Sequence, residues 1–338
     1  MVKETLHKLA HGESLTFDEA ATFVDAIADG AVGQMQIAAF LTALRVKGES
    51  IAEVAACAQA LRRRATAVPH RQKLVFDCCG TGGDNSHSFN ISTAASFVIA
   101  ASGVPVAKHG NRAMSSSCGS ADLLEAAGVR LELEPEHAAR LLDELGYCFL
   151  FAPSYHPAMK NVAAVRKELG FRTIFNMLGP LLNPAKATHQ LIGTATRQTA
   201  ELLASAAQHL PETKVVTVHN SHGFDEILPT GTNHRYQWLD ADLFADPIEL
   251  PLALQNGYQP ADLRGGDRET NLAILDQVLS NKDSAYKVAT LLNAGFALVI
   301  AGKAVDLEEG AEIAAETLRT GKAKRLLSEY AAASRGIA

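Results

Sequence analysis

Residues 80–93 read Gly80-Thr81-Gly82-Gly83-Asp84-Asn85-Ser86-His87-Ser88-Phe89-Asn90-Ile91-Ser92-Thr93. The apolar run Leu74–Phe76 precedes them and predicts a buried strand, and the small apolar residues 94–101 that follow predict a helix. A strand, a glycine-rich turn and a helix start together aim backbone N–H groups and a positive dipole end at an anion. Glycine lets the backbone approach phosphate oxygens without a Cβ in the way. The stretch therefore predicts a phosphate-binding turn.

The spacing excludes two common phosphate-binding motifs. The dinucleotide fingerprint G-x-G-x-x-G requires glycine at position 85, where this chain has Asn85. The Walker A motif ends in Gly-Lys-Ser/Thr, a tripeptide that does not occur in the sequence. A plain glycine turn without a ligand is the alternative that this stretch, taken alone, leaves open.

A second turn repeats the pattern after the predicted strand Val104–Ala107. It consists of Lys108-His109-Gly110-Asn111-Arg112 and then Ser115-Ser116-Ser117-Cys118-Gly119-Ser120-Ala121-Asp122, which open another helix. Turns that follow neighbouring parallel strands meet at one edge of the sheet, where ligands bind in α/β folds. Two such turns suit a ligand that carries phosphate at two places.

Four motifs in the chain resemble those of the anthranilate phosphoribosyltransferase family, in the family's order and approximate spacing. They are GTGGD…FNIST, KHGNR…SS-x-CGSAD, VRKELGFRTIFNMLGPLLNP and FDEI, within residues 80–227. The family consists of glycosyltransferases that are similar to the nucleoside phosphorylases. The resemblance implies an enzyme of tryptophan biosynthesis that transfers the phosphoribosyl group of phosphoribosyl pyrophosphate to the amine of anthranilate and releases pyrophosphate.

The resemblance also implies which residues bind the substrates. For phosphoribosyl pyrophosphate they come from the two turns: Gly80, Gly83, Asp84, Ser88, Asn90, Ile91, Ser92, Thr93, Lys108, His109, Gly110, Asn111, Arg112, Ser115, Ser116 and Ser120. For anthranilate they are Gly80, Asn111, Arg166 and His156. A guanidinium fork and an amide suit a planar carboxylate. Without the motif, Arg166 is better interpreted as a surface residue of a predicted helix.

A metal is implied by the chemistry and by the family. Loss of pyrophosphate separates charge, which preorganised donors and a metal stabilise. The resemblance places Mg²⁺ on Ser92, Asp225 and Glu226, which offer the hard oxygen ligands that this ion prefers. A solvated loop is the alternative for the acidic pair. His222 stands where the family often has aspartate, and we hypothesise that its imidazole alters metal binding.

Lys108, His109 and Arg166 are the candidate catalytic residues. Lys108 is positioned by the motif to stabilise the leaving pyrophosphate. His109 shapes its turn, with a weak acid–base role at most, because an arylamine loses its proton easily once it is bonded to carbon. His156, immediately before Pro157, is an equally good packing residue.

Composition and patterning give the fold class and the location. The 338 residues carry a net charge of −6, which argues against nucleic acid or an anionic membrane as the main partner. No signal peptide is evident, the apolar stretch Val288–Ala301 is too short to span a bilayer, and the five cysteines form no zinc spacing. We expect a cytoplasmic protein with free thiols.

The fold class is α/β, with a small all-helical domain and a larger domain whose mostly parallel sheet is covered by helices. Residues 1–66 predict helices, with capping boxes at Thr16–Glu19 and Ser50–Glu53. Alternating strands and helices over 73–153 and 185–338 predict the parallel sheet, and Val129–Leu131 is among the predicted strands. The resemblance implies that 154–184 returns to the helical domain on the cleft side, and the helical domain's small core favours a homodimer.

The sequence is also compared with two rival functions. A pyrimidine nucleoside phosphorylase shares the fold and the glycine turn, but it lacks the combination of KHGNR with VRKELG. A non-catalytic homologue that only binds a ligand is the second rival. Loss of the acidic pair, Lys108 or Arg166 would mark such a protein, and all of them are present.

Overall fold

A seven-stranded sheet forms the centre of the protein, which a computed structural model describes over residues 1–84, 86–113, 117–210, 213–239, 242–255 and 257–336. The strand order is β3-β2-β1-β4-β5-β6-β7. The first five strands in this order are parallel to one another. Strand β6 is antiparallel to β5, and β7 is antiparallel to β6. The strands are β1 (Phe76–Gly80), β2 (Val106–Gly110), β3 (Tyr147–Phe151), β4 (His189–Gly193), β5 (Lys214–Asn220), β6 (Asn233–Leu239) and β7 (Asp242–Pro247).

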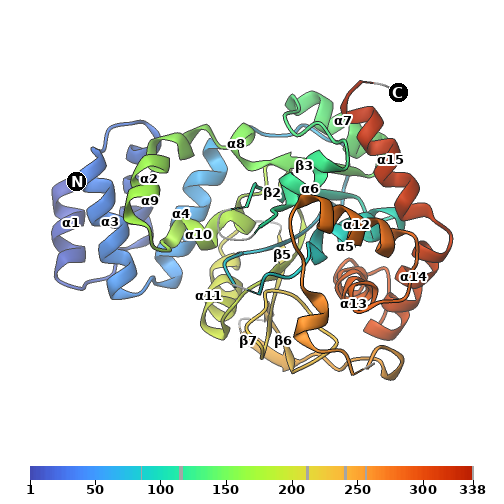
Figure 1. Ribbon diagram of the computed structural model, residues 1–338. Helices are drawn as coiled ribbons and strands as arrows, with labels where there is room; N and C mark the ends of the chain where they lie inside the picture. Colours follow the sequence, from blue (N-terminus) through green and yellow to red (C-terminus); the bar gives the residue numbers. More distant parts are fainter. Residues whose placement is uncertain (85, 114–116, 211–212, 240–241, 256, 337–338) are drawn as a thin grey trace.

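Four N-terminal helices form a bundle beside the sheet (Figure 1). They are α1 (Val2–Ala10), α2 (Phe17–Ala28), α3 (Gln34–Lys47) and α4 (Ile51–Arg64). Both predicted capping boxes are present, at the starts of α2 and α4. The later helices α9 (Lys160–Leu169) and α10 (Ile174–Leu178) pack on α3, and α9 also contacts α2. Their buried side chains share one apolar core with the bundle.

The remaining helices cover the sheet or connect its strands. They are α5 (Ile91–Ala101), α6 (Ser120–Ala126), α7 (Pro135–Leu145), α8 (Ala152–Tyr155), α11 (Arg197–Ala207), α12 (Arg268–Leu279), α13 (Ala285–Ile300), α14 (Leu307–Arg319) and α15 (Lys322–Ser334). Short 3-10 turns lie at η1 (Pro157–Met159), η2 (Gly179–Leu182), η3 (Leu252–Leu254) and η4 (Pro260–Leu263). Helix α5 packs on β1, β2 and α13, whereas α11 packs on β5 and β6 and also contacts α4.

One predicted strand is absent. Val129–Leu131 alternates as a strand does, with Val129 and Leu131 buried and Arg130 exposed. The segment pairs with no strand of the described structure, however, and the Arg130 N–H donates to the Ser334 hydroxyl at 3.0 Å. The residues form an extended connection between α6 and α7, because side-chain alternation alone does not supply a hydrogen-bonding neighbour.

The long apolar stretch near the C-terminal end forms a core helix. Within the described part of the chain, no helix combines the length and the apolar character that crossing a bilayer requires. Most of α13 is buried, and its apolar residues belong to the core of the sheet domain.

Candidate functional site

The carboxyl ends of the central strands bring the two predicted turns to one edge of the sheet. Strands β1, β2 and β4 each end in glycine, at Gly80, Gly110 and Gly193. Gly80 is in register with Gly193, and the Thr81 N–H donates to the Gly193 carbonyl at 2.9 Å. The strand order changes direction between β1 and β4, which is where ligands bind in open α/β sheets.

Glycine is required at the ends of β1 and β4 because the acidic loop after β5 presses against them. A Cβ on Gly80 would lie 2.1 Å from Asp225 Oδ2, and one on Gly193 would lie 1.6 Å from the Asp225 carbonyl oxygen. Asp225 Oδ2 accepts a hydrogen bond of 3.0 Å from the Gly82 N–H. The first turn and the acidic pair are therefore one packed unit.

Three residues that the sequence analysis proposed for the phosphate and metal site meet at the start of α5. Glu226 Oε1 accepts from the Ser92 N–H at 3.1 Å, and the Ser92 hydroxyl lies 3.4 Å from Lys108 Nζ. Lys108 is 1% exposed, and its ammonium donates to the Cys78 carbonyl at 2.6 Å. The strands β1 and β2, the helix α5 and the acidic loop each contribute one part of this cluster.

Burial disfavours the charged forms of Asp225 and Glu226 unless a cation lies beside them. Burial, followed by the nearby Asp84 carboxylate, raises the pKa of Asp225 to about 7. Burial, followed by Asp225, raises the pKa of Glu226 to about 8, although Lys108 opposes the rise. Among the described residues, nothing donates a hydrogen bond to the buried Asp84 Oδ2. A cation bound among these oxygens would offset their repulsion.

The donor chemistry fits Mg²⁺. The available ligands are carboxylate and hydroxyl oxygens, which this ion prefers to nitrogen or sulfur. Among the residues that the structure describes, no three His, Cys, Asp or Glu side chains are grouped closely enough to hold an ion by themselves. Mg²⁺ usually keeps several waters and takes further oxygen ligands from a substrate phosphate. A site with only a few protein ligands is therefore typical of this ion.

The two candidate histidines form a buried pair. The His109 and His156 Nε2 atoms are 3.1 Å apart, and His109 Nδ1 lies 3.1 Å from the Gly179 carbonyl oxygen. Because Nδ1 must donate to that carbonyl, His109 Nε2 accepts and His156 Nε2 carries the shared hydrogen. Burial lowers the pKa of His109 to about 3 and that of His156 to about 4. Both rings are neutral at pH 7, and this geometry favours positioning over proton transfer.

Asp77 is a site residue that the sequence analysis missed. It is fully buried in β1, where Oδ1 accepts from the His109 N–H at 3.1 Å and Oδ2 accepts from Asn183 Nδ2 at 2.8 Å. Asn183 also donates to the Ala107 carbonyl at 2.7 Å. The carboxylate thus ties the second turn to the end of the segment 154–184. A charged residue directly after the apolar run Leu74–Phe76 was the only available signal.

Arg172 is the second residue that was missed. Its guanidinium donates to the carbonyl oxygens of Gly82 and Thr81 from the segment between α9 and α10. A Cβ on Gly83 would lie 1.6 Å from Arg172 Nη1, so this glycine is needed for the close approach. Arg172 therefore connects the helical side of the molecule to the first turn.

Arg166 and Asn111 are not joined by any contact in the described structure. Arg166 is half-buried on α9, and burial lowers the pKa of its guanidinium. Within the described residues this guanidinium makes no hydrogen bond or ion pair. The Asn111 side-chain oxygen accepts from the Arg112 N–H at 2.8 Å, and its backbone carbonyl accepts from the Ser120 hydroxyl. An unpartnered, partly buried guanidinium is suited to an anionic ligand.

The other predicted residues take several positions. The Arg112 guanidinium pairs with Asp122 and Glu125 on α6. Ser88 accepts from the Ser86 hydroxyl, and Thr93 Oγ1 is buried without a partner among the described residues. Ile91, the first residue of α5, is fully buried.

A Cβ on Gly110 would lie 2.4 Å from Ser120 Oγ, so this glycine lets the hydroxyl approach. Ser115, Ser116 and Asn85 lie outside the described residues.

His222 is exposed, and its ring lies over Gly231, where a Cβ would be 2.6 Å from the imidazole Cδ2. Its N–H donates to the Asn220 side chain. No contact joins its ring to Asp225 or Glu226 in the described structure.

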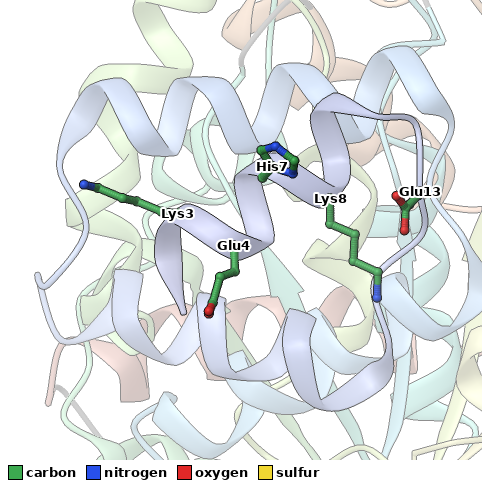
Figure 2. A pocket seen from close by; sticks show the side chains of 5 residues that line it. All are labelled: Lys3, Glu4, His7, Lys8 and Glu13. Atoms are coloured by element: carbon green, nitrogen blue, oxygen red, sulfur yellow. The ribbon is translucent and has the colours of Figure 1, made fainter.

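A hollow of about 460 Å³ lies elsewhere, on the outer helix of the bundle (Figure 2). It is lined by Lys3, Glu4, His7, Lys8 and Glu13, all from α1 and the turn after it. Lys8 is already paired with Glu19. Helix α1 lies on the side of the bundle away from the sheet, so this hollow is separate from the candidate site (Figure 1).

The chain matches a family of known proteins over most of its length. The helical bundle domain of a glycosyl transferase family matches residues 3–65, and the a/b domain of that family matches residues 72–324. An anthranilate phosphoribosyltransferase of Methylobacterium radiotolerans is 47% identical over 332 residues, which are 97% of this chain and 95% of that protein. Together these matches cover both parts of the molecule.

Two solved structures have the same fold over their full length. The crystal structure of anthranilate phosphoribosyltransferase from Thermus thermophilus has a TM-score of 0.91 and 39% identity, covering 98% of this chain and 99% of that one. The Saccharomyces cerevisiae enzyme in complex with phosphoribosyl pyrophosphate and Mg has a TM-score of 0.89 and 25% identity, covering 99% and 98%. The chain therefore belongs to the glycosyl transferase family, and within it to the anthranilate phosphoribosyltransferases.

Proposed function

We propose that this protein transfers the phosphoribosyl group of phosphoribosyl pyrophosphate to the amine of anthranilate, with release of pyrophosphate, in tryptophan biosynthesis. The observation that carries the proposal is the cluster of Lys108, Ser92 and Glu226 beneath two glycine turns at one sheet edge. The names of the relatives and the yeast complex with phosphoribosyl pyrophosphate and Mg support it.

In this proposal three parts of the site have separate tasks. The N-terminus of α5 and the Lys108 ammonium stabilise the negative charge that develops on the departing pyrophosphate. Ser92, Asp225 and Glu226 would hold Mg²⁺, which supplies charge neutralisation on the pyrophosphate oxygens when it is bound. The neutral His109–His156 pair fixes the end of β2 against Gly179 and orients the acceptor side of the site.

The activity is tested by mixing the protein with Mg²⁺, phosphoribosyl pyrophosphate and anthranilate and following the loss of anthranilate fluorescence. We expect loss that depends on all three additions. A parallel assay with thymidine and inorganic phosphate tests the phosphorylase alternative. Turnover in the second assay alone, or in neither, would contradict the proposed function.

Arg166→Ala is expected to raise the KM for anthranilate about 10- to 100-fold, because loss of a charge-assisted hydrogen bond to a carboxylate costs about 1.5–3 kcal/mol. The KM for phosphoribosyl pyrophosphate should change much less. Lys167→Ala, which removes a neighbouring exposed cation from the same helix, is the matched control. An anthranilate KM that rises equally in both variants would remove Arg166 from the acceptor site.

The domain division and the oligomeric state are further proposals. Residues 1–66 with 154–184 form the helical domain, and 73–153 with 185–338 form the phosphoribosyl pyrophosphate domain, as the shared core of α9, α10 and the bundle supports. Helix α3 carries Met35 and Val46, which are 87% and 82% exposed. Their spacing of 11 residues places them on one helix face, since 11 residues make close to three turns. This face suits a homodimer contact.

Met35→Glu combined with Val46→Glu is expected to convert the dimer to a monomer, because two charges would be buried in the contact. Light scattering after size-exclusion chromatography measures the mass. Leu252→Glu, at an apolar residue that is 86% exposed on the larger domain, is the control. A double variant of unchanged mass would place the contact elsewhere.

We also propose a cytoplasmic location. All five cysteines are free, and four of them are buried, which suits a reducing compartment.

A further inference from the structure

The segment Leu263–Asn271 runs alongside the first turn and bonds to it through the backbone. The Phe89 N–H donates to the Leu263 carbonyl at 3.0 Å, and the Gly265 N–H donates to the His87 carbonyl at 2.8 Å. Between these bonds Ser88 and Arg264 form an antiparallel bridge. This segment is far from the turn in the sequence, in a region without any motif of its own.

Gly265 and His87 show how closely the two backbones approach. A Cβ on Gly265 would lie 2.8 Å from the Phe89 Cα, so glycine is required there. His87 has φ of +52°, in the left-handed region that a non-glycine residue rarely occupies. Such a conformation persists only where neighbouring contacts hold it, and the Gly265 N–H supplies one.

Asn271 continues the connection with its side chain. It is 2% exposed on α12, its Oδ1 accepts from the Gly266 N–H at 3.0 Å, and its Nδ2 donates to Asn90 Oδ1 at 3.2 Å. Asn90 Nδ2 in turn donates to the Cys118 carbonyl at 3.1 Å. Asn271 therefore fixes the orientation of an amide that links the first turn to the second.

Arg268 reaches the second turn from the same helix. Its guanidinium donates to Asp122 and Glu125 on α6, each at 3.1 Å. The other oxygen of Asp122 accepts from the Ala113 and Gly119 N–H groups at 2.9 and 3.0 Å. Asp122 thus holds two separate parts of the second turn together, and Arg268 holds Asp122.

We propose that Asn271 and Arg268 are positioning residues that fix the two phosphate turns relative to each other for phosphoribosyl pyrophosphate. The inference rests on the proposed function. A ligand with phosphate at two places needs both turns at a set separation, whereas anthranilate carries a single carboxylate, which we propose that Arg166 on α9 binds. The segment that carries both residues bonds to the two turns, and among the described residues no hydrogen bond or ion pair joins it to α9 or Arg166, so we expect its effect to fall mainly on phosphoribosyl pyrophosphate.

The test measures both KM values separately. Asn271→Ala is expected to raise the KM for phosphoribosyl pyrophosphate at least tenfold, with less than threefold change in kcat and in the KM for anthranilate. Arg268→Ala, at a half-exposed ion pair, should raise it about three- to fivefold, and Arg268→Lys should stay within twofold of the wild type. Arg319→Ala, which breaks an exposed pair with Glu316 on α14, is the control.

The results distinguish failure of the proposed function from failure of the positioning role of Asn271 and Arg268. A wild-type protein without phosphoribosyl pyrophosphate-dependent activity overturns the proposed function and the inference together. An active wild type with a KM for phosphoribosyl pyrophosphate within twofold in both alanine variants overturns the inference alone. Equal rises in both KM values, or no rescue by lysine, also overturn it, because they indicate general damage. If Asn271→Ala fails to fold, Asn271→Asp and the half-exposed Arg268 carry the test.

Discussion

Asp225→Asn combined with Glu226→Gln is expected to lower kcat/KM for phosphoribosyl pyrophosphate on the order of a thousandfold. Both substitutions keep the size of the side chains and remove the charges that would attract Mg²⁺. In the native protein Asp225 Oδ2 accepts from the Gly82 N–H. An amide at position 225 accepts this hydrogen bond only through its oxygen, because its NH₂ group is a donor. Turnover measured against Mg²⁺ concentration, with calorimetry of Mg²⁺ in the presence of pyrophosphate, detects the loss.

The stability of the same variant separates loss of the metal from loss of the fold. The pKa values of Asp225 and Glu226 are raised to about 7 and about 8, whereas unfolded carboxyl groups titrate near 4. The folded protein without Mg²⁺ therefore binds more protons than the unfolded chain, so its stability falls as the pH rises from about 4 to about 8. The double variant lacks these groups and should lose less stability over that range.

Urea denaturation with a chelator at pH 5 and pH 8 measures this difference. Asp246→Asn, at a half-exposed carboxylate on β7 that pairs with Arg235, is the control and should behave as the wild type. A double variant that retains turnover would remove the acidic pair from the mechanism. One that is inactive and also much less stable at pH 8 would show that the pair serves the fold.

The sequence alone was sufficient for features that depend on neighbouring residues. The capping boxes at Thr16 and Ser50 are formed as expected, because each of them involves residues only three positions apart. The glycine-rich turn was also evident, because strand, turn and helix start are consecutive in the chain. Each of these predictions uses interactions across a few residues only.

The missed features depend on partners far away in the sequence. Asp77 owes its role to Asn183, 106 residues later, and Asn271 owes its role to Asn90, 181 residues earlier. Arg172 lies inside a recognised motif, yet its contact with Gly82 crosses 90 residues. The predicted strand at Val129–Leu131 failed for the same reason, since a strand needs a partner that alternation does not identify.

Lys108→Met is expected to lower the free energy of unfolding by about 3–5 kcal/mol, because it removes one member of a buried group of charges. Lys108 is 1% exposed and its neighbour Asp77 is fully buried, and the positive charge of Lys108 opposes the rise that burial causes in the pKa of Asp77. Turnover should fall by at least a hundredfold, since the ammonium beside Ser92 would no longer stabilise the leaving pyrophosphate.

Urea denaturation and turnover at pH 8 are measured on the same preparation, with the exposed Lys303→Met as the control. Lys108→Arg should not restore activity, because the larger guanidinium does not fit a fully packed site. A Lys108→Met protein with unchanged stability would contradict the account of charge compensation between Lys108 and Asp77. The hydrogen bonds that Asp77 accepts from the His109 N–H and from Asn183 would then be the whole of its contribution, and the lysine would be retained for pyrophosphate alone.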